Sequence, residues 1–162
     1  MVTLNEVKKK PKLFIGSSVE GLSLAEGMKL NLMHDFNSVI WNEGVFRGGS
    51  LGILDLLNAV KAFDFAAFVF SPDDKVTRPT RNQEHNTVRD NVIFECGLFM
   101  GQLGLERTFF VVPSGDKSLV LPTDLTGVNP IEYEADNDLT PLSIMGSACI
   151  QIKQAKNRLL GK

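Results

Sequence analysis

One carboxylate stands out in the sequence. Glu95 lies in VRDNVIFECGLFMGQLG, residues 88–104, a stretch that is almost wholly apolar after its first four residues. On a helical wheel of about 100° per residue, Glu95 falls about 20° from Val88, about 40° from Phe99 and about 60° from Val92. We therefore expect its side chain to point along an apolar stripe, toward a sheet or a cleft.

A carboxylate in such a place permits two interpretations. A buried acid either raises its pKa or finds a cationic partner. It could be a structural acid at the helix edge, paired with Arg47, Arg81 or Arg89. It could instead lie at the rim of a cleft with a tuned pKa and face a ligand. The helical wheel alone leaves both interpretations open.

Local signals also predict how this helix begins and packs. Thr87 and Asp90 have the Ser/Thr-x-x-Asp/Glu spacing of a capping box, which predicts a helix that starts near Val88. Gly97 and Gly101 lack side chains, so they would allow a neighbouring backbone to approach closely.

A second candidate for chemistry is the turn at the end of KLFIGSS. Gly16, Ser17 and Ser18 follow an apolar run and precede a predicted helix. Backbone N–H groups and hydroxyls at such a turn could hold phosphate or ribose oxygens. A plain helix N-cap by Ser17 or Ser18 is the alternative.

The loop WNEGVFRGG is a third candidate. It holds an acid, Glu43, an aromatic ring, Phe46, and a base between glycines. The residues around Phe46 cannot form an apolar face, so we expect its ring to stack on a flat ligand or to pack against another subunit. The alternative is an exposed ring tucked under its own loop.

The polar segment 71–87 is longer than the usual strand-to-helix connection of about 2–6 residues, so we expect a functional or mobile loop. Its bases, Lys75, Arg78, Arg81 and His85, could attract phosphates. The alternative is a solvated loop, because nearby acids offset much of this charge.

The composition excludes several classes of protein. The chain has 162 residues, 43% hydrophobic and 22% charged. Its net charge of −2 gives no overall attraction to nucleic acid, which leaves only local basic clusters as an alternative. Cys96 and Cys149 lack zinc-site spacing and are expected to be buried thiols in a reducing cytoplasm. Residues 1–12 lack the apolar core of a secretory signal, and no apolar run reaches the ~18 residues of a membrane span.

The candidate site residues lie on or between predicted strands and helices that alternate along the chain. Apolar runs predict strands at 12–18, 38–41, 63–70, 108–112 and 129–133. Helical spacing predicts helices at 19–36, 51–61, 88–104 and 140–160. This α/β alternation predicts one domain, 12–160, after a polar lead-in, 1–11. We expect a flavodoxin-like five-stranded parallel sheet of order 2-1-3-4-5, with ligands bound at the loops 16–20, 42–50 and 71–90.

Five stretches together resemble a known family. They are KPKLFIGSSVEGLSLAE, WNEGVF, FDFAAFVFSPDD, RDNVIFECGLFMGQLGLERTFFVVP and LPTDLTGV, within about residues 10–135. The chain resembles the predicted nucleotide-binding, TIR-like domains of bacteria, including those of TIR-STING proteins from cyclic-oligonucleotide antiphage defence. Cys96 departs slightly from the family pattern, where leucine is more usual.

The resemblance implies a flavodoxin-like TIR fold with helices on both faces and NAD⁺ glycohydrolase activity. It implies that Glu95, in RDNVIFE, is the catalytic glutamate, and that NEGVFRGG is the loop that gates the site and mediates self-assembly. The substrate-lining residues implied are Gly16, Ser17, Ser18, Glu43, Phe46, Asp73, Asp74, Arg89, Asp90 and Asn91.

The resemblance further implies that NAD⁺ is the substrate, with no cofactor and no metal, in a cytoplasmic protein that acts as a filament or oligomer. A STING-like or other sensor domain is expected beyond residue 162, and no nucleic-acid or membrane partner is expected. Two alternatives stay open, a nucleoside deoxyribosyltransferase-like hydrolase and a non-catalytic TIR assembly module. The product could be ADP-ribose, a cyclic isomer or an exchanged base.

Overall fold

A five-stranded parallel sheet forms the centre of the computed structural model, which describes residues 9–44, 52–78, 83–125 and 127–161. Its strands are β1 (Lys12–Ser17), β2 (Asn37–Ile40), β3 (Phe65–Val69), β6 (Thr108–Pro113) and β8 (Ile131–Tyr133). They lie in the order β2-β1-β3-β6-β8, and every pair is parallel. Counted along the chain within this sheet, that is the predicted order 2-1-3-4-5.

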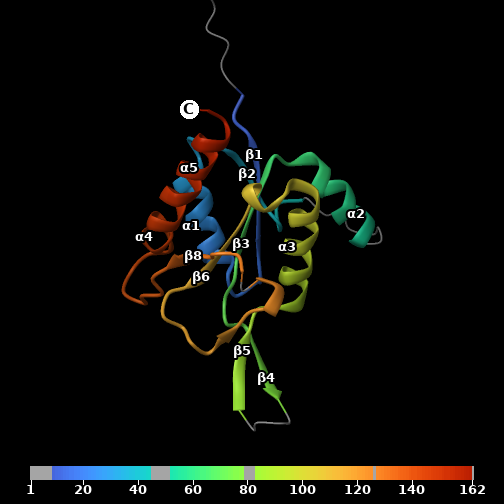
Figure 1. Ribbon diagram of the computed structural model, residues 1–162. Coiled ribbons are helices and arrows are strands. Elements are labelled where there is room, and N and C mark those ends of the chain that lie inside the picture. The colour runs from blue at the N-terminus through green and yellow to red at the C-terminus, as the bar shows by residue number, and fades with distance from the viewer. Residues whose placement is uncertain (1–8, 45–51, 79–82, 126, 162) are drawn as a thin grey trace, which may run out of the picture.

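Helices cover both faces of the sheet, as predicted. Figure 1 shows α1, α4 and α5 on one face and α2 and α3 on the other. Their bounds are α1 (Leu22–Leu32), α2 (Gly52–Ala59), α3 (Asp90–Leu103), α4 (Pro141–Ile144) and α5 (Gly146–Leu159). Three short 3₁₀ helices connect elements, η1 (Val60–Ala62), η2 (Leu105–Arg107) and η3 (Thr123–Leu125).

Strand alternation divides the interior into two cores. In β1, Leu13 and Ile15 face the core under α1 and α5, whereas Phe14 faces the core under α3. Phe14 stacks on Phe99 of α3, with ring centroids 4.6 Å apart. Both faces of the sheet are buried because helices cover each, which explains why these strands read as continuous apolar runs.

The long polar segment is not the loop that we predicted. It forms an antiparallel hairpin of β4 (Asp74–Arg78) and β5 (Gln83–Thr87), and β5 pairs with the short strand β7 (Leu119–Val120). Figure 1 shows this hairpin projecting from the end of the main sheet. A hairpin outside the core is held largely by backbone hydrogen bonds, so it does not need the apolar alternation that marks a core strand.

Two predictions about α3 are wrong. The helix starts at Asp90 with Arg89 as N-cap and no capping side chain, because Thr87 is the last residue of β5. Gly97 and Gly101 are exposed, and a Cβ at either position would meet nothing within 4 Å. They therefore bring no neighbouring backbone close.

The cysteines lie where the sequence indicated, because Cys96 and Cys149 are free, buried thiols. Burial raises the pKa of each thiol to about 12, so both stay protonated. In the part of the chain that the structure describes, no helix combines the length and the apolar run needed to cross a bilayer.

Close backbone approach occurs instead at Gly27, where α1 meets α4. A Cβ at Gly27 would lie 2.5 Å from the carbonyl carbon and oxygen of Pro141. Asn31 holds the two helices together, since its Nδ2 donates to the Gly27 carbonyl at 2.9 Å and to the Leu142 carbonyl at 2.8 Å.

We predict that Gly27→Ala lowers the free energy of unfolding by about 1–3 kcal/mol, because the added methyl group must push two backbones apart. Urea unfolding measures this change. Gly101→Ala is the matched control, and it should raise the free energy of unfolding by about 0.5–1 kcal/mol, because alanine favours an open helical position over glycine. Equal effects of the two substitutions would contradict the close contact at Gly27.

Candidate active site

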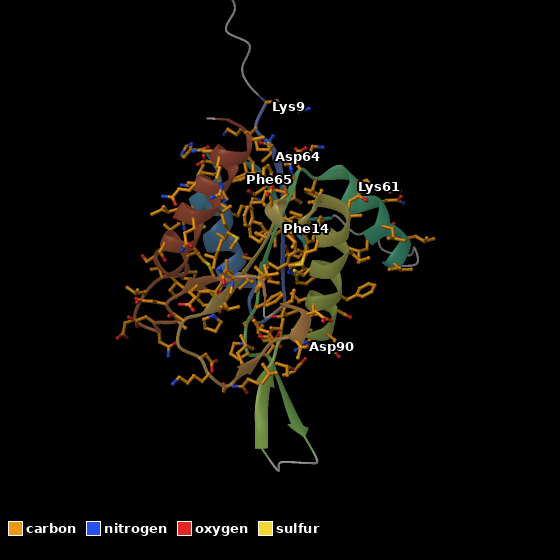
Figure 2. The ribbon with its side chains drawn as sticks, viewed as in Figure 1. Lys9, Phe14, Lys61, Asp64, Phe65 and Asp90 are labelled. Atoms are coloured by element: carbon orange, nitrogen blue, oxygen red, sulfur yellow. The ribbon has the colours of Figure 1, made fainter. Side chains whose placement is uncertain are left out.

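The candidate site lies at the carboxyl ends of β1 and β3, beside the start of α3. Figure 2 shows Asp90 at this end of the molecule, with Lys9, Asp64 and Phe65 at the opposite end of the sheet. Doubly wound folds bind ligands at this edge, because the strand order reverses there and leaves a crevice between neighbouring loops. Here that reversal falls at β1, which has β2 on one side and β3 on the other.

Glu95 is half-buried on α3, between residues that pack into the core. Val92, Cys96 and Phe99 are at most 3% exposed, so the helix presents its buried face to the sheet beside Glu95. Burial raises the pKa of the Glu95 carboxyl to about 7. The orientation inferred from the helical wheel is therefore confirmed, and near neutral pH the group holds its proton about half of the time.

The pairing that would make Glu95 a structural acid does not occur with Arg89. The Arg89 guanidinium instead donates to Glu20 at 3.0 Å and lies 3.2 Å from the Asp74 carboxylate. Arg47 and Arg81 lie outside the described residues, and within the described ones no cation pairs with Glu95.

Two hollows meet at Glu95. The α2–α3 cleft has a volume of about 330 Å³ and is lined by Gly52, Ile53, Leu56, Asn91, Phe94 and Glu95. The β1 pocket has a volume of about 170 Å³ and is lined by Ser17, Ser18, Val19, Trp41, Arg89, Asn91, Val92 and Glu95. Glu95 and Asn91 line both hollows, so a ligand that extends from one into the other would pass the carboxylate.

Two buried serines, Ser17 and Ser18, line the β1 pocket. Ser17 accepts a hydrogen bond from the Trp41 indole N–H at 3.0 Å and donates to the Ser18 carbonyl at 2.9 Å. The Ser18 hydroxyl accepts the N–H of Gly21 at 3.0 Å. Gly21 is the N-cap residue of α1, so neither serine is the cap itself, although Ser18 supports the start of the helix. These bonds fix the indole of Trp41 against the pocket.

Gly16 lies in β1, next to Ser17, and lines neither hollow. A Cβ at this position would lie 2.5 Å from the Phe68 ring, so the glycine is needed for packing within the sheet. The structure therefore gives Gly16 a role in the packing of β1 beside β3.

Glu43 also lies away from both hollows. Its carboxylate accepts hydrogen bonds from Lys29 at 2.6 Å and from the Ile40 N–H at 2.9 Å. Burial alone would raise the pKa of Glu43, but these two bonds and the Lys29 charge hold it below its usual value. The structure thus places Glu43 in an ion pair between α1 and the end of β2.

The remaining predicted residues divide between the site and its surroundings. Arg89 and Asn91 line the hollows with Ser17, Ser18 and Glu95. Asp90 is exposed at the start of α3, and Asp74 contacts Arg89 from the hairpin. Asp73 is half-buried, and its N–H donates to the carbonyls of Ser71 and Thr87. Phe46 lies outside the described residues.

The sequence analysis did not predict the aromatic and aliphatic residues that line the two hollows. Trp41 directly follows β2, so its place at the carboxyl end of a strand was an available signal. Phe94 is 54% exposed and lines the α2–α3 cleft, although the helical wheel places it on another face from Glu95. Ile53 and Leu56 come from α2, and no local pattern connects that helix with Glu95.

The arrangement suits the stabilisation of a developing positive charge. Glu95 can stay ionised near neutral pH, hydrogen-bond a hydroxyl or accept a proton from water. An apolar cleft lies on one side of it and a pocket with hydroxyls and a guanidinium on the other. The described residues contain no group of three or more histidines, cysteines or acids that could hold a metal ion.

Comparison with known proteins identifies close sequence relatives. Residues 12–135 match the family model described as CAP12/Pycsar effector protein, TIR domain. The chain is 42% identical to the Pycsar effector protein PaPycTIR of Pseudomonas aeruginosa over 149 residues, 91% of this chain and 47% of that protein. It is 42% identical to CD-NTase-associated protein 12 of Flavobacterium daejeonense over 125 residues, 77% of this chain and 39% of that protein. The chain thus spans less than half the length of these relatives.

A solved structure agrees with the fold. A diflavin flavoprotein A3 from Nostoc sp. superposes with a TM-score of 0.52 and covers 96% of this chain and all of its own. The two sequences are 11% identical, so this likeness shows the fold alone.

Proposed function

This chain belongs to the family of CAP12/Pycsar effector TIR domains, and we propose that it is an NAD⁺ glycohydrolase that cleaves the nicotinamide–ribose bond. We infer that it is the effector domain of a bacterial antiphage defence protein and becomes active on self-assembly. Its relatives are called effector proteins and CD-NTase-associated proteins. A cyclic-nucleotide signal, sensed by a STING-like or other domain of the whole protein, fits those names.

The observation that carries the proposal is the place of Glu95. A carboxylate whose pKa is raised to about 7 by burial is costly to ionise, and no described residue offers it a compensating cation. Carboxyl groups with such a raised pKa are concentrated at functional sites. Glu95 also borders two hollows, so both sides of a bond cleaved at the carboxylate have space beside it.

The chemistry needs one carboxylate. As the bond between C1′ and the ring nitrogen breaks, both electrons go to the nitrogen, so nicotinamide leaves neutral and needs no acid. The ribose carries a positive charge in an oxocarbenium-like state, which an ionised Glu95 stabilises. Water then adds to C1′ and loses a proton, which Glu95 can accept, to give ADP-ribose.

Product analysis tests the proposal. The protein, at concentrations at which it self-associates, is incubated with NAD⁺, and nicotinamide, ADP-ribose and cyclic products are separated by chromatography. Release of nicotinamide supports the proposal. Base release from deoxynucleosides with intact NAD⁺ would indicate a deoxyribosyltransferase-like hydrolase. Assembly without any cleavage would indicate a non-catalytic module.

The rate should depend on pH through Glu95. Since burial raises the pKa of Glu95 to about 7 and the ionised form is the active one, kcat/KM should fall about tenfold per pH unit below pH 7. It should level off above about pH 8. Initial rates of nicotinamide release across this range measure the profile, and the residual rate of Glu95→Gln should show no such inflection. A flat wild-type profile would contradict the assignment.

A further inference from the structure

A further pocket lies at the opposite end of the sheet from Glu95. Figure 2 shows Lys9, Asp64 and Phe65 at that end, where β1 and β3 begin. This amino-end pocket has a volume of about 480 Å³, larger than either hollow at Glu95, and it shares no lining residue with them. We propose that it binds a diphosphate group, free or on a nucleotide. The inference is independent of the proposed function, because it makes no use of Glu95.

Positive charge is concentrated around the amino-end pocket. Its described lining residues include four bases and one acid, whereas the whole chain has a net charge of −2. The bases are Lys9, Lys10, Lys12 and Arg107. None of them forms an ion pair with another residue that the structure describes. Such a local excess of positive charge attracts an anion that carries several negative charges.

The one acid of the pocket has a structural role. The Asp64 carboxylate accepts the backbone N–H of Lys12 at 2.8 Å, and the Asp64 N–H donates to the Lys12 carbonyl at 3.0 Å. These two bonds join the first residue of β1 to the residue that precedes β3. The carboxylate is therefore engaged with the backbone, and its single charge leaves the lining side chains with an excess of positive charge.

Two of the bases are held in place by the fold. The half-buried Arg107 has its guanidinium carbon 5.1 Å from the centroid of the buried Phe65 ring. The Lys10 ammonium donates to the Met33 carbonyl at 3.0 Å and keeps two further donors. A guanidinium can donate two parallel N–H groups to one phosphate, and an ammonium suits a second phosphate as a point charge. Because these donors are already ordered, less conformational entropy is lost when an anion binds.

The size of the pocket favours a diphosphate over a small single anion. Its volume of about 480 Å³ falls in the range of about 300–1,000 Å³ that is usual for ligand pockets. Two linked phosphates can contact Arg107 and the lysines at the same time, which one small anion cannot do. Pro11, Ala62 and Leu160 add apolar surface beside the charges, and a nucleoside attached to the diphosphate could cover it.

NMR titration of the 162-residue chain with ADP and with inorganic pyrophosphate tests the proposal. Both compounds should shift the amide signals of Lys12, Asp64 and Phe65 and the Arg107 Nε–H signal, and the shifts should saturate. A Kd at least about threefold lower for ADP would identify a nucleotide as the source of the diphosphate, because its nucleoside adds apolar contact. Equal Kd values would identify free diphosphate.

Three results would overturn the proposal. The first is the absence of saturable shifts with either compound. The second is a set of shifts confined to Ser17, Ser18 and Asn91, which would place the anion beside Glu95. The third is a set of equal, unsaturated shifts at lysines over the whole surface, which would indicate non-specific attraction.

Substitutions give a second readout. Arg107→Gln should raise the Kd about tenfold, because it removes charge-assisted hydrogen bonds. Lys12→Gln should raise it about fivefold and leaves the contact between Arg107 and Phe65 intact, so it also serves if Arg107→Gln folds poorly. Arg158→Gln is the matched control, since Arg158 is exposed on α5 and does not line the pocket. Its Kd should stay within about twofold of wild type, since exposed charges are screened by salt. Equal Kd values for Arg107→Gln and Arg158→Gln would contradict a specific site.

Discussion

The substitution Glu95→Gln is expected to lower the kcat of NAD⁺ cleavage by at least about 100-fold. Glutamine has the size of glutamate and lacks its charge, so it cannot stabilise the cationic ribose or accept a proton from water. Loss of one such group typically costs about 10²–10³ in rate. The KM should change little, because both hollows keep their walls. Nicotinamide release by the assembled protein measures the loss.

Glu106→Gln is the matched control for this experiment. Glu106 is exposed on η2, beyond the end of α3 opposite Asp90, and it lines neither hollow. Its substitution removes the same charge and should leave kcat within twofold of the wild-type value. If the kcat of Glu95→Gln lies within threefold of the wild-type value, Glu95 is not the catalytic residue.

The same substitution is expected to make the protein more stable. In the unfolded chain Glu95 ionises near its ordinary pKa of 4.5, whereas burial in the folded protein raises that pKa to about 7. Between these values the folded state binds the proton that the unfolded state has lost, so wild-type stability falls as pH rises from about 4.5 to about 7. Above about pH 8 the loss is complete and stays constant.

Glutamine cannot ionise, so the stability of Glu95→Gln should not fall in this way as pH rises. The raised pKa corresponds to about 3 kcal/mol, which we discount to about 2 kcal/mol because the side chain is half-buried and partly solvated. Glu95→Gln should therefore exceed the wild type by about 2 kcal/mol in free energy of unfolding at pH 8 and match it near pH 4.5. Urea unfolding of the 162-residue chain at several pH values measures the difference.

The stability experiment separates the two interpretations of Glu95. A functional acid is kept at the expense of stability, so its removal stabilises the fold while activity is lost. A structural acid paired with a cation would behave oppositely, because its removal leaves a buried charge unpaired. A Glu95→Gln variant less stable than wild type at pH 8 would therefore restore the structural interpretation. Glu106→Gln should show no comparable pH-dependent difference.

Local patterns were sufficient to predict the main sheet. Each core strand is a short apolar run because both of its faces are covered, and each run lies between helical segments. Alternation of such elements permits few topologies, and the order 2-1-3-4-5 is among the commonest of them. The unusual position of Glu95 is likewise a local property, since Val92 and Phe99 on its side of α3 are buried, as is Val88 just before the helix.

Local sequence patterns did not predict the structure where it depends on backbone pairing or on contacts between distant residues. The hairpin β4–β5 has a polar sequence because it lies outside the core, so it carries no apolar signal. Gly97 and Gly101 form a small-residue pattern, yet they face solvent, whereas Gly27 meets Pro141 across 114 positions of sequence. Sequence spacing records which residues share a face of one element and says nothing about which element lies opposite.

The sequence by itself determined the α/β fold and an acid on the buried side of α3, because these depend on the periodicity of single segments. It also determined the order of the sheet, because alternating strands and helices permit few topologies. Only the tertiary structure decided the surroundings of that acid. In the folded protein Arg89 pairs with Glu20 and Asp74, and Glu43 pairs with Lys29. Residues of α2 and Phe94 line the cleft beside Glu95. The physical reason is that ion pairs and cleft walls join residues from separate elements, and their distances are set only when the helices pack against the sheet.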